Sequence, residues 1–389
     1  MRKTVVLLTS LCIFLHAHSQ TAVHYLIPYR LGNLWGYSDI KGNIVIPTQF
    51  QQTFLFYDNV AVVKSDGHFS IIAKEGKPLI PYRYDYISNY DDGVAIASRA
   101  GKWTVLDVKG KELTKKTYDA ITPFSEGMAI AREGEKFGYI DKKGNEVVPA
   151  QFDFVAPFSG GRAVVKNLGQ YGYINSKGVL VIPMQYTGAT SFHEDLALVR
   201  KDSLWGFIDE DGKVKISFQF QDANFFSEGL AAVKKVDSVG FIDESGQVVI
   251  TPRYQNANNF KEGMALVERN GKVGFIDKTG KEIIPPQFDA ANDFSSGVAL
   301  FFQDNNLGMI KKDGTTIMLT QYKDVKNFSE GFARVEQDNR WGYLNDAGFE
   351  IIPCKYENSD DFIEGLALVM KNGQWGFIDK TGREFFRDQ

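Results

Sequence analysis

Carboxylates that recur at constant spacing are the residues of this chain best suited to catalysis. Aspartates such as Asp141, Asp277 and Asp379 stand three residues before a glycine. A second set directly precedes a glycine and consists of Glu126, Glu228, Glu262, Glu330 and Glu364. Two carboxylates suffice for glycoside hydrolysis when their environments differ. Because the copies resemble one another, we interpret both sets as turn-capping residues, and a carbohydrate hydrolase with a carboxylate pair in a diverged repeat remains an alternative.

Other patterns of catalytic or metal-binding residues are missing from the sequence. His24, His68 and His193 have no histidine or cysteine neighbour at the spacing of a zinc site, and Cys354 is the only cysteine beyond the N-terminal segment. The carboxylates of any single loop are too few for a calcium motif. There is no phosphate-binding loop, nucleophile elbow or dinucleotide fingerprint. The sequence therefore predicts no catalytic residue, no metal site, no cofactor and no enzyme.

A motif with a period of 34 residues organises the chain, and its clearest copies are Trp205-Gly206-Phe207-Ile208-Asp209 and the segment 375–379. We number positions from its glycine, the anchor. Steps of 34 from Gly36 reach Ser70, Thr104, Gly138, Gly172, Gly206, Gly240, Gly274, Gly308, Gly342 and Gly376 without insertion or deletion. A period in this range predicts an array in which each unit buries its apolar surface against its neighbours.

Each unit reads as a three-stranded antiparallel meander followed by an irregular connector. Position +6 is glycine in all eleven units, including Gly42, Gly144, Gly280 and Gly382. With aspartate at +3, this pattern predicts a turn that is closed by a left-handed glycine. The connector has aromatic residues at +14 and +20 (Phe260 and Phe362 at +20) and alanine at +25 (Ala265 and Ala367). We predict structural roles for these residues and for the anchors Gly206 and Gly376.

All five tryptophans stand directly before the anchor: Trp35, Trp103, Trp205, Trp341 and Trp375. If this position lined an exposed groove, the indoles could stack on sugars or on partner side chains, so we name these five as candidate binding residues. Other units carry Val239, Val273 or Leu307 at the same position, which favours a role in packing.

The predicted strands have apolar residues on both faces, which indicates that the units stack face to face. We expect an all-β, open, curved or superhelical solenoid-like array of eleven units. A closed β-propeller-like ring is the alternative. Propellers commonly have 4 to 8 four-stranded blades, and the sequence shows no obvious split unit that would close a ring.

The N-terminus has the layout of a secretory signal peptide. Arg2 and Lys3 precede an apolar run from Val5 to Leu15, and Ala17-His18-Ser19 forms a cleavage site. We therefore predict a signal peptide over residues 1–19, one repeat array over 20–389, and export to the periplasm or the extracellular space. Without Arg2 and Lys3, 42 basic and 48 acidic side chains leave a net charge of −6. With no basic block, we expect no nucleic-acid partner and no membrane insertion.

The motif resembles that of the WG-repeat proteins, which are common among exported proteins of Bacteroidetes-type bacteria. The resemblance rests on Trp-Gly-Phe-Ile-Asp, the glycine turn, Ile-Ile-Pro and Phe-Ser-Glu-Gly-Leu-Ala, and it extends over residues 26–387. It implies a β-rich repeat scaffold and no general activity, so the family supplies no catalytic residues.

Three units depart from the pattern. Ser70 and Thr104 replace the anchor glycine, and the unit of Leu307 has Leu319 in place of proline. The first two fit capping near a terminus, and the third fits either drift or a working surface. The leading hypothesis is a non-enzymatic exported scaffold that binds a protein or a glycan along its surface. A structural envelope spacer is a further alternative, and the sequence makes no prediction of oligomeric state.

Overall fold

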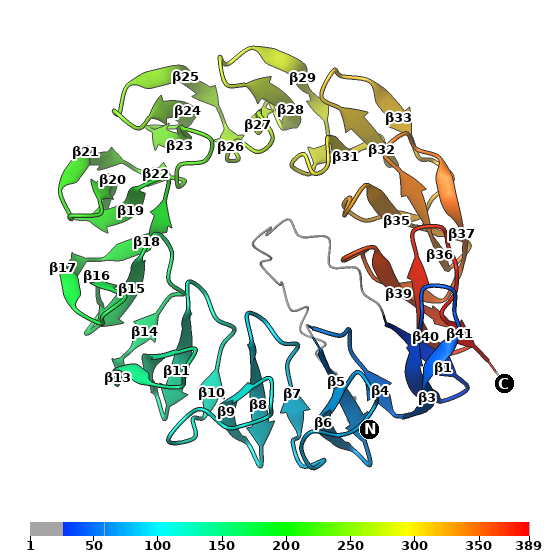
Figure 1. Cartoon of the computed structure of the whole chain (residues 1–389). Helices are drawn as coiled ribbons and strands as arrows, with labels where there is room; N and C mark the ends of the chain where they lie inside the picture. The colour runs from blue at the N-terminus through cyan, green and yellow to red at the C-terminus, as the bar shows by residue number, and fades with distance from the viewer. Residues whose placement is uncertain (1–25, 58, 389) are drawn as a thin grey trace, which may run out of the picture.

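A computed structural model describes residues 26–57 and 59–388, and in these residues the chain forms eleven small antiparallel sheets of three or four strands. The sheets, called blades here, follow one another around a ring with a wide central opening (Figure 1). We number each blade by the anchor on its third strand, so that blade 1 contains Gly36 and blade 11 contains Gly376. The signal-peptide prediction lies outside the described residues.

Each complete blade has an inner, a second, a third and an outer strand, and the outer strands follow the rim of the ring (Figure 1). The inner strands are β4 (Gln52–Thr53), β7 (Tyr86–Ile87), β10 (Ala120–Ile121), β14 (Phe154–Val155), β18 (Gly188–His193), β22 (Asp222–Ala223), β26 (Asn256–Ala257), β30 (Ala290–Ala291), β34 (Asp324–Val325) and β38 (Asn358–Ser359). The second strands are β1 (Ile27–Leu31), β5 (Val60–Ser65), β8 (Val94–Arg99), β11 (Met128–Glu133), β15 (Arg162–Asn167), β19 (Leu196–Lys201), β23 (Leu230–Lys235), β27 (Met264–Arg269), β31 (Val298–Gln303), β35 (Phe332–Gln337) and β39 (Leu366–Lys371).

The third strands are β2 (Leu34–Ser38), β6 (His68–Ala73), β9 (Lys102–Asp107), β12 (Lys136–Asp141), β16 (Gln170–Asn175), β20 (Leu204–Asp209), β24 (Ser238–Asp243), β28 (Lys272–Asp277), β32 (Asn306–Lys311), β36 (Arg340–Asn345) and β40 (Gln374–Asp379). The outer strands are β3 (Ile44–Phe50), β13 (Glu146–Phe152), β17 (Leu180–Tyr186), β21 (Val214–Phe220), β25 (Val248–Tyr254), β29 (Glu282–Phe288), β33 (Thr316–Met318) and β37 (Glu350–Tyr356). The C-terminal strand β41 (Phe386–Arg387) instead pairs with the second strand of blade 1. The predicted meander forms the second, third and outer strands. The connector, which we expected to be irregular, adds the short inner strand of the next blade.

The anchor glycine is needed because the outer strand bulges against it. In blade 7 the register between β24 and β25 shifts on both sides of Phe241, which brings the backbone of β25 over Gly240. A Cβ on Gly240 would lie 2.4 Å from the carbonyl oxygen of Ile250 and 2.6 Å from the nitrogen of Pro252. Gly240 is not among the residues with positive φ, so close approach is what excludes a side chain here.

Blades 2 and 3 confirm this reading, because they carry a side chain at the anchor and have only three strands. In blade 2 the hydroxyl of Ser70 donates to the carbonyl of Ile80 at 2.6 Å, and in blade 3 Thr104 Oγ1 lies 2.7 Å from Thr114 Oγ1. Only isolated bridges such as Phe69 to Tyr84 remain where blade 1 and blades 4 to 10 have an outer strand.

The turn between the third and outer strands has the geometry that the sequence pattern predicts. In blade 8, Gly280 has a φ of +82°, and its N–H donates to the carbonyl of Asp277 at 2.9 Å. The carboxylate of Asp277 accepts the N–H groups of Thr279 and Lys281 at 2.9 and 3.0 Å. Gly42, Gly144 and Gly382 also have positive φ. These aspartates therefore cap their own turns.

The hydrophobic core lies between blades rather than inside any one of them. The cluster between blades 7 and 8 combines Phe241 and Tyr254 of the first with Ala265 and Val267 of the second, and Phe260 lies at its inner end. Phe362 and Ala367 occupy the same places between blades 10 and 11. The predicted face-to-face stacking is thus confirmed.

The ring is closed by the C-terminus, so the structure corresponds to the closed alternative and not to the open array that we preferred. Ile378 and Phe377 of β40 pair with Glu384 and Phe385, and the next two residues, β41, pair in parallel with β1 at the start of the described chain. One C-terminal segment therefore joins blade 11 to blade 1. Because this segment is only a few residues long and pairs in parallel, the antiparallel repeat pattern gave no sign of it.

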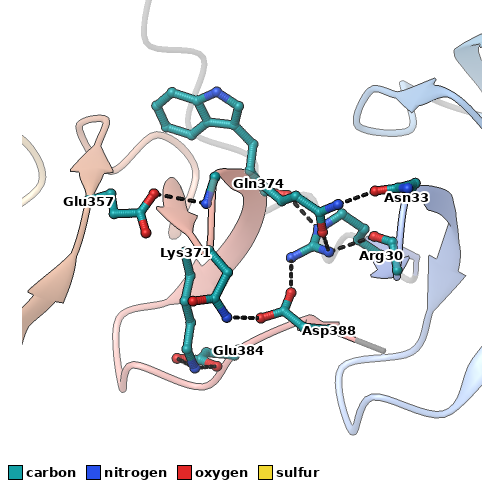
Figure 2. Close-up of polar contacts among 11 residues, drawn as sticks. Arg30, Asn33, Glu357, Lys371, Gln374, Glu384 and Asp388 are labelled. Atoms are coloured by element: carbon teal, nitrogen blue, oxygen red, sulfur yellow. Dashed lines mark hydrogen bonds and ion pairs between the residues drawn. The ribbon is translucent and has the colours of Figure 1, made fainter.

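Arg30 fastens this closure and is only 2% exposed. Its Nε donates to the carbonyl of Trp375 at 2.7 Å, its Nη2 donates to Asp388 at 2.8 Å, and its Nη1 donates to Gln374 and Gly32. Figure 2 shows Arg30 between Gln374 and Asp388, with Asn33 bonded to the far side of Gln374. The guanidinium thus connects the second strand of blade 1 to three residues of the C-terminal unit.

Candidate functional site

The structure places the five tryptophans at equivalent points on the third strands, each partly buried near the hairpin that joins the second and third strands. Trp35, Trp103 and Trp205 pack against clusters between blades. Trp341 differs, because Lys326 Nζ and the Arg334 guanidinium carbon lie 5.7 and 5.8 Å from its ring centre. An indole beside two cations has both apolar and polar contacts to offer a ligand.

Ring closure brings three of the tryptophans into consecutive blades. Trp341 belongs to blade 10, Trp375 to blade 11 and Trp35 to blade 1. The Trp35 ring also meets Phe377 of blade 11 edge-on, with 6.0 Å between centroids. Since packed sheets lie about 10 Å apart, the three indoles are spaced on that order along the ring. The other two tryptophans, in blades 3 and 6, have no tryptophan in an adjacent blade.

Arg334 on β35 is the strongest departure from the repeat near these tryptophans. The ten equivalent residues are all apolar: Pro28, Val62, Ile96, Ile130, Val164, Leu198, Ala232, Leu266, Leu300 and Leu368. Arg334 Nε donates to Asp361 at 2.6 Å and its Nη1 donates to the carbonyl of Ser359 at 2.5 Å, both in blade 11. Because charged groups are costly in a packed interface, an arginine at this point indicates a role other than stability.

Three carboxylates lie near this region: Asp324 on the inner strand of blade 10, and Asp360 and Asp361 directly after the inner strand of blade 11. Asp324 pairs with Lys326 at 2.5 Å, and Asp360 lies next to Asp361 in the chain. Removal of water by the surrounding protein raises the pKa of Asp360, although the residue as a whole is exposed at the surface. The charge of Arg334 opposes this rise and that of Asp361 adds to it. We call Asp324, Lys326, Arg334, Trp341, Asp360 and Asp361 the blade 10/11 cluster.

Asp360 is unlike the carboxylates that the sequence singles out. Among the described aspartates and glutamates with a resolved shift, it alone has a raised pKa, whereas the pKa of turn residues such as Asp243 and Asp277 is lowered by hydrogen bonds to their own turns. Asp360 and Arg334 belong to no short sequence motif, so a search for motifs did not identify them. The signal that could have found them is the alignment of the repeats against one another.

We expected the glutamates before glycine to cap their own turns. In the structure they instead join neighbouring blades. Glu262 of blade 8 accepts the N–H groups of Ser296 and Gly297 of blade 9 at 2.8 and 2.9 Å, and Lys312 lies 3.2 Å away. Burial disfavours the charged form of Glu262, yet these contacts lower its pKa. Glu126, Glu228 and Glu330 make equivalent bonds. These carboxylates are therefore already engaged in holding the ring together.

The remaining candidates have structural surroundings. His193 stacks on Phe225 with 4.0 Å between ring centres, and burial lowers its pKa. Burial raises the pKa of the Cys354 thiol to about 12, which makes it a poor nucleophile at neutral pH. In the described part of the chain, no three histidine, cysteine or acidic side chains group as metal ligands would, and no helix is long and apolar enough to cross a membrane.

The diverged ninth blade contains a pocket of about 100 Å³, lined by Phe301, Phe302 and Leu307 with Val325 of the next blade. Sites for small organic ligands are commonly about 300 to 1,000 Å³. The diverged residue Leu307 thus lines a small gap, whereas Leu319 does not line it and is buried in the core.

Comparisons with known proteins agree with the repeat. A family profile described as WG containing repeat matches ten segments, namely residues 35–67, 71–103, 103–137, 137–170, 171–205, 205–237, 240–272, 274–306, 308–341 and 341–375. No curated protein matches the chain.

Similar solved structures have low sequence identity. The crystal structure of the eukaryotic initiation factor is 11% identical with a TM-score of 0.39, and the match covers 76% of this chain and 96% of that one. BamB from Moraxella catarrhalis is 14% identical with a TM-score of 0.31, covering 69% and 92%. PorZ of Porphyromonas gingivalis is 11% identical with a TM-score of 0.27, covering 92% and 60%.

Proposed function

The chain belongs to the WG containing repeat family, and from this premise we propose that it is a non-enzymatic exported scaffold that binds a glycan or protein partner where blades 10, 11 and 1 meet. The observation that carries the proposal is the position of Arg334. This position is apolar in all the other blades, but in blade 10 it is an arginine that lies beside Trp341. In the same sector, three tryptophans occupy consecutive blades.

The chemistry of this sector suits a partner with both apolar and polar faces. Indoles stack on the C–H faces of sugars or on partner side chains, while Lys326, Asp324 and Asp361 remain partly exposed for hydrogen bonding. Arg334 is only 20% exposed and bonds to Ser359 and Asp361 of blade 11, so it links the second strand of blade 10 to the inner strand of blade 11 beside Trp341. Its role in this proposal is positioning.

The experiment is a screen of residues 20–389 against glycans and envelope proteins, followed by titration of the hits. We expect Trp341→Ala and Arg334→Leu each to weaken binding at least about tenfold, a cost of roughly 1.4 kcal/mol. Arg334→Leu should leave the melting temperature unchanged or raised, because a well-packed apolar residue can replace a buried ion pair without loss. Trp205→Ala is the matched control, since Trp205 holds the same position in blade 6 beside Arg200.

A uniform loss of binding in all three variants, or no loss in any, would contradict the location of the site. If well-folded protein binds nothing in the screen, the structural spacer becomes the better hypothesis.

A carbohydrate hydrolase remains the second candidate, because Asp360 and Asp361 are adjacent carboxylates in different environments: the pKa of Asp360 is raised, whereas Asp361 is ion-paired with Arg334. Turnover of a bound glycan that Asp360→Asn abolishes while affinity is kept would favour the hydrolase over the scaffold.

A further inference from the structure

A second surface lies on blades 5, 6 and 7, at the hairpins between their second and third strands. These hairpins carry Lys166, Arg200, Lys201, Lys234 and Lys235, and in the described structure none of the five forms an ion pair within 4.0 Å. Three of the five lie over the rings of Tyr171, Trp205 and Phe220 instead. Because blade topology repeats around the ring, all three hairpins lie on one face.

On two other hairpins, those of blades 8 and 10, cations are neutralised by acids. Arg269 and Lys272 of blade 8 pair with Glu282 and Asp289 at 2.5 Å each, and Arg340 of blade 10 pairs with Glu357 at 3.4 Å. The difference has a sequence cause. Arg269 is equivalent to Lys201 and Lys235, and its partner Glu282 at +8 is replaced by Val214 in blade 6 and Val248 in blade 7.

Nearby acids only partly balance this charge. Asp202 and Asp237 lie in the hairpins themselves, and Asp222 stands opposite Lys234 in the strand register. The five cations are spread over some seventy residues of sequence, so no basic block is visible until the ring brings them together.

Two apolar side chains stand out of this cationic surface in strained conformations. Leu168 is 96% exposed with a φ of +49°, and Val236 is 72% exposed with a φ of +55°. The equivalent residues of other blades are suited to positive φ or to water, for example Asn270, Asn372 and Asp304. A β-branched residue at positive φ is an outlier, and here nothing in the fold covers it. Strain and exposure together indicate that these two tips serve an interaction.

We propose that this face makes a peripheral contact with an anionic lipid bilayer, into whose interface Leu168 and Val236 insert while the five cations lie at the headgroups. The two tips project from the surface as single exposed side chains. A bilayer requires no groove, because it deforms around single projecting side chains and its anionic surface attracts basic ones. The contact is independent of the blade 10/11 cluster and leaves it free for a partner.

The test is co-sedimentation of residues 20–389 with vesicles of phosphatidylcholine alone or with about one-third phosphatidylglycerol, whose negative potential draws basic side chains. We expect binding only to the anionic vesicles, weakened at least fivefold by Leu168→Asn combined with Val236→Asn. The same loss is expected for Lys201→Gln combined with Lys235→Gln. Asparagine tolerates positive φ, so the first pair leaves the fold intact or more stable. Lys272→Gln, which removes an ion-paired lysine from blade 8, should bind as the parent does.

Equal binding to neutral and anionic vesicles, or none to either, would overturn the proposal. It would also be overturned if the lysine variant lost binding while the Leu168 and Val236 variant did not, because that result identifies a face for an acidic protein or polyanion rather than a bilayer.

Discussion

Replacing Arg30 with alanine is expected to open the ring and to lower the free energy of unfolding by about 3 kcal/mol or more. Removing one partner from a buried, hydrogen-bonded ion pair commonly costs 3 to 5 kcal/mol. Here the same change also deprives the Trp375 and Gly32 carbonyls of a donor and exposes the Phe386 ring that the guanidinium covers at 5.1 Å. Thermal melting and small-angle scattering would detect the lost stability and the larger radius.

The matched control is Arg132→Ala. Arg132 stands at the same position of the repeat in blade 4, but its side chain is exposed, so its removal should leave both the melting temperature and the radius unchanged. A chain that ends after Arg383 should behave like the Arg30 variant, because it lacks β41 and Asp388. If Arg30→Ala had the same melting temperature as the parent protein, the stability of ring closure would not depend on the contacts of Arg30.

Replacing Gly240 with alanine should cost about 3 kcal/mol, the upper end of the range for overpacking. The added methyl group would meet the backbone of β25 at 2.4 Å, and backbone atoms cannot turn aside as a flexible side chain does. We expect the outer strand of blade 7 to detach, as in the two blades that naturally carry a side chain there. Amide hydrogen exchange along 248–254 would show the loss.

Ser70→Ala provides the comparison, because it keeps a Cβ at the anchor of a blade that has already adapted to one. Only the hydrogen bond to Ile80 is lost, for which a cost of about 1 kcal/mol is typical. Equal destabilisation by Gly240→Ala and Ser70→Ala would refute the close-approach explanation of the anchor glycine.

The fold was largely predictable because the residues of each repeat specify its own turns and its own packing faces. Gly280 and Asp277 specify a turn, and residues such as Phe241 and Ala265 specify the two faces that meet between blades. Ring closure was not predictable, because it depends on the summed rotation between eleven blades and on a short parallel pairing between the two ends of the chain. A period in the sequence carries no information about that angle.

The candidate site was only partly visible in the sequence. The tryptophans could be named from the sequence. The sequence does not distinguish a tryptophan that packs against a neighbouring blade, such as Trp205, from one that lies beside Arg334, such as Trp341. Arg334 and Asp360 escaped notice because neither belongs to a recognised motif. They become informative when each is compared with its copies in other repeats, because the copies of Arg334 are all apolar and those of Asp360 are uncharged apart from Lys326 of blade 10.

Closure links the fold to the proposed function, since only a closed ring sets blade 10, blade 11 and blade 1 side by side. An open array would leave Trp35 at one end and Trp375 at the other. The shared site of these three blades therefore depends most on the contact between the two ends of the chain, where Asn33 bonds to Gln374 (Figure 2).

The measurement that tests this contact most directly is cross-linking of a variant with Asn33→Cys and Gln374→Cys by a short bismaleimide, read by peptide mass spectrometry. A closed ring predicts rapid intramolecular linkage of these two positions in dilute folded protein, and loss of that linkage when Arg30 is also replaced by alanine. Folded protein in which the two thiols react separately, or link only between molecules, would contradict the closed ring and with it the shared site of blades 10, 11 and 1.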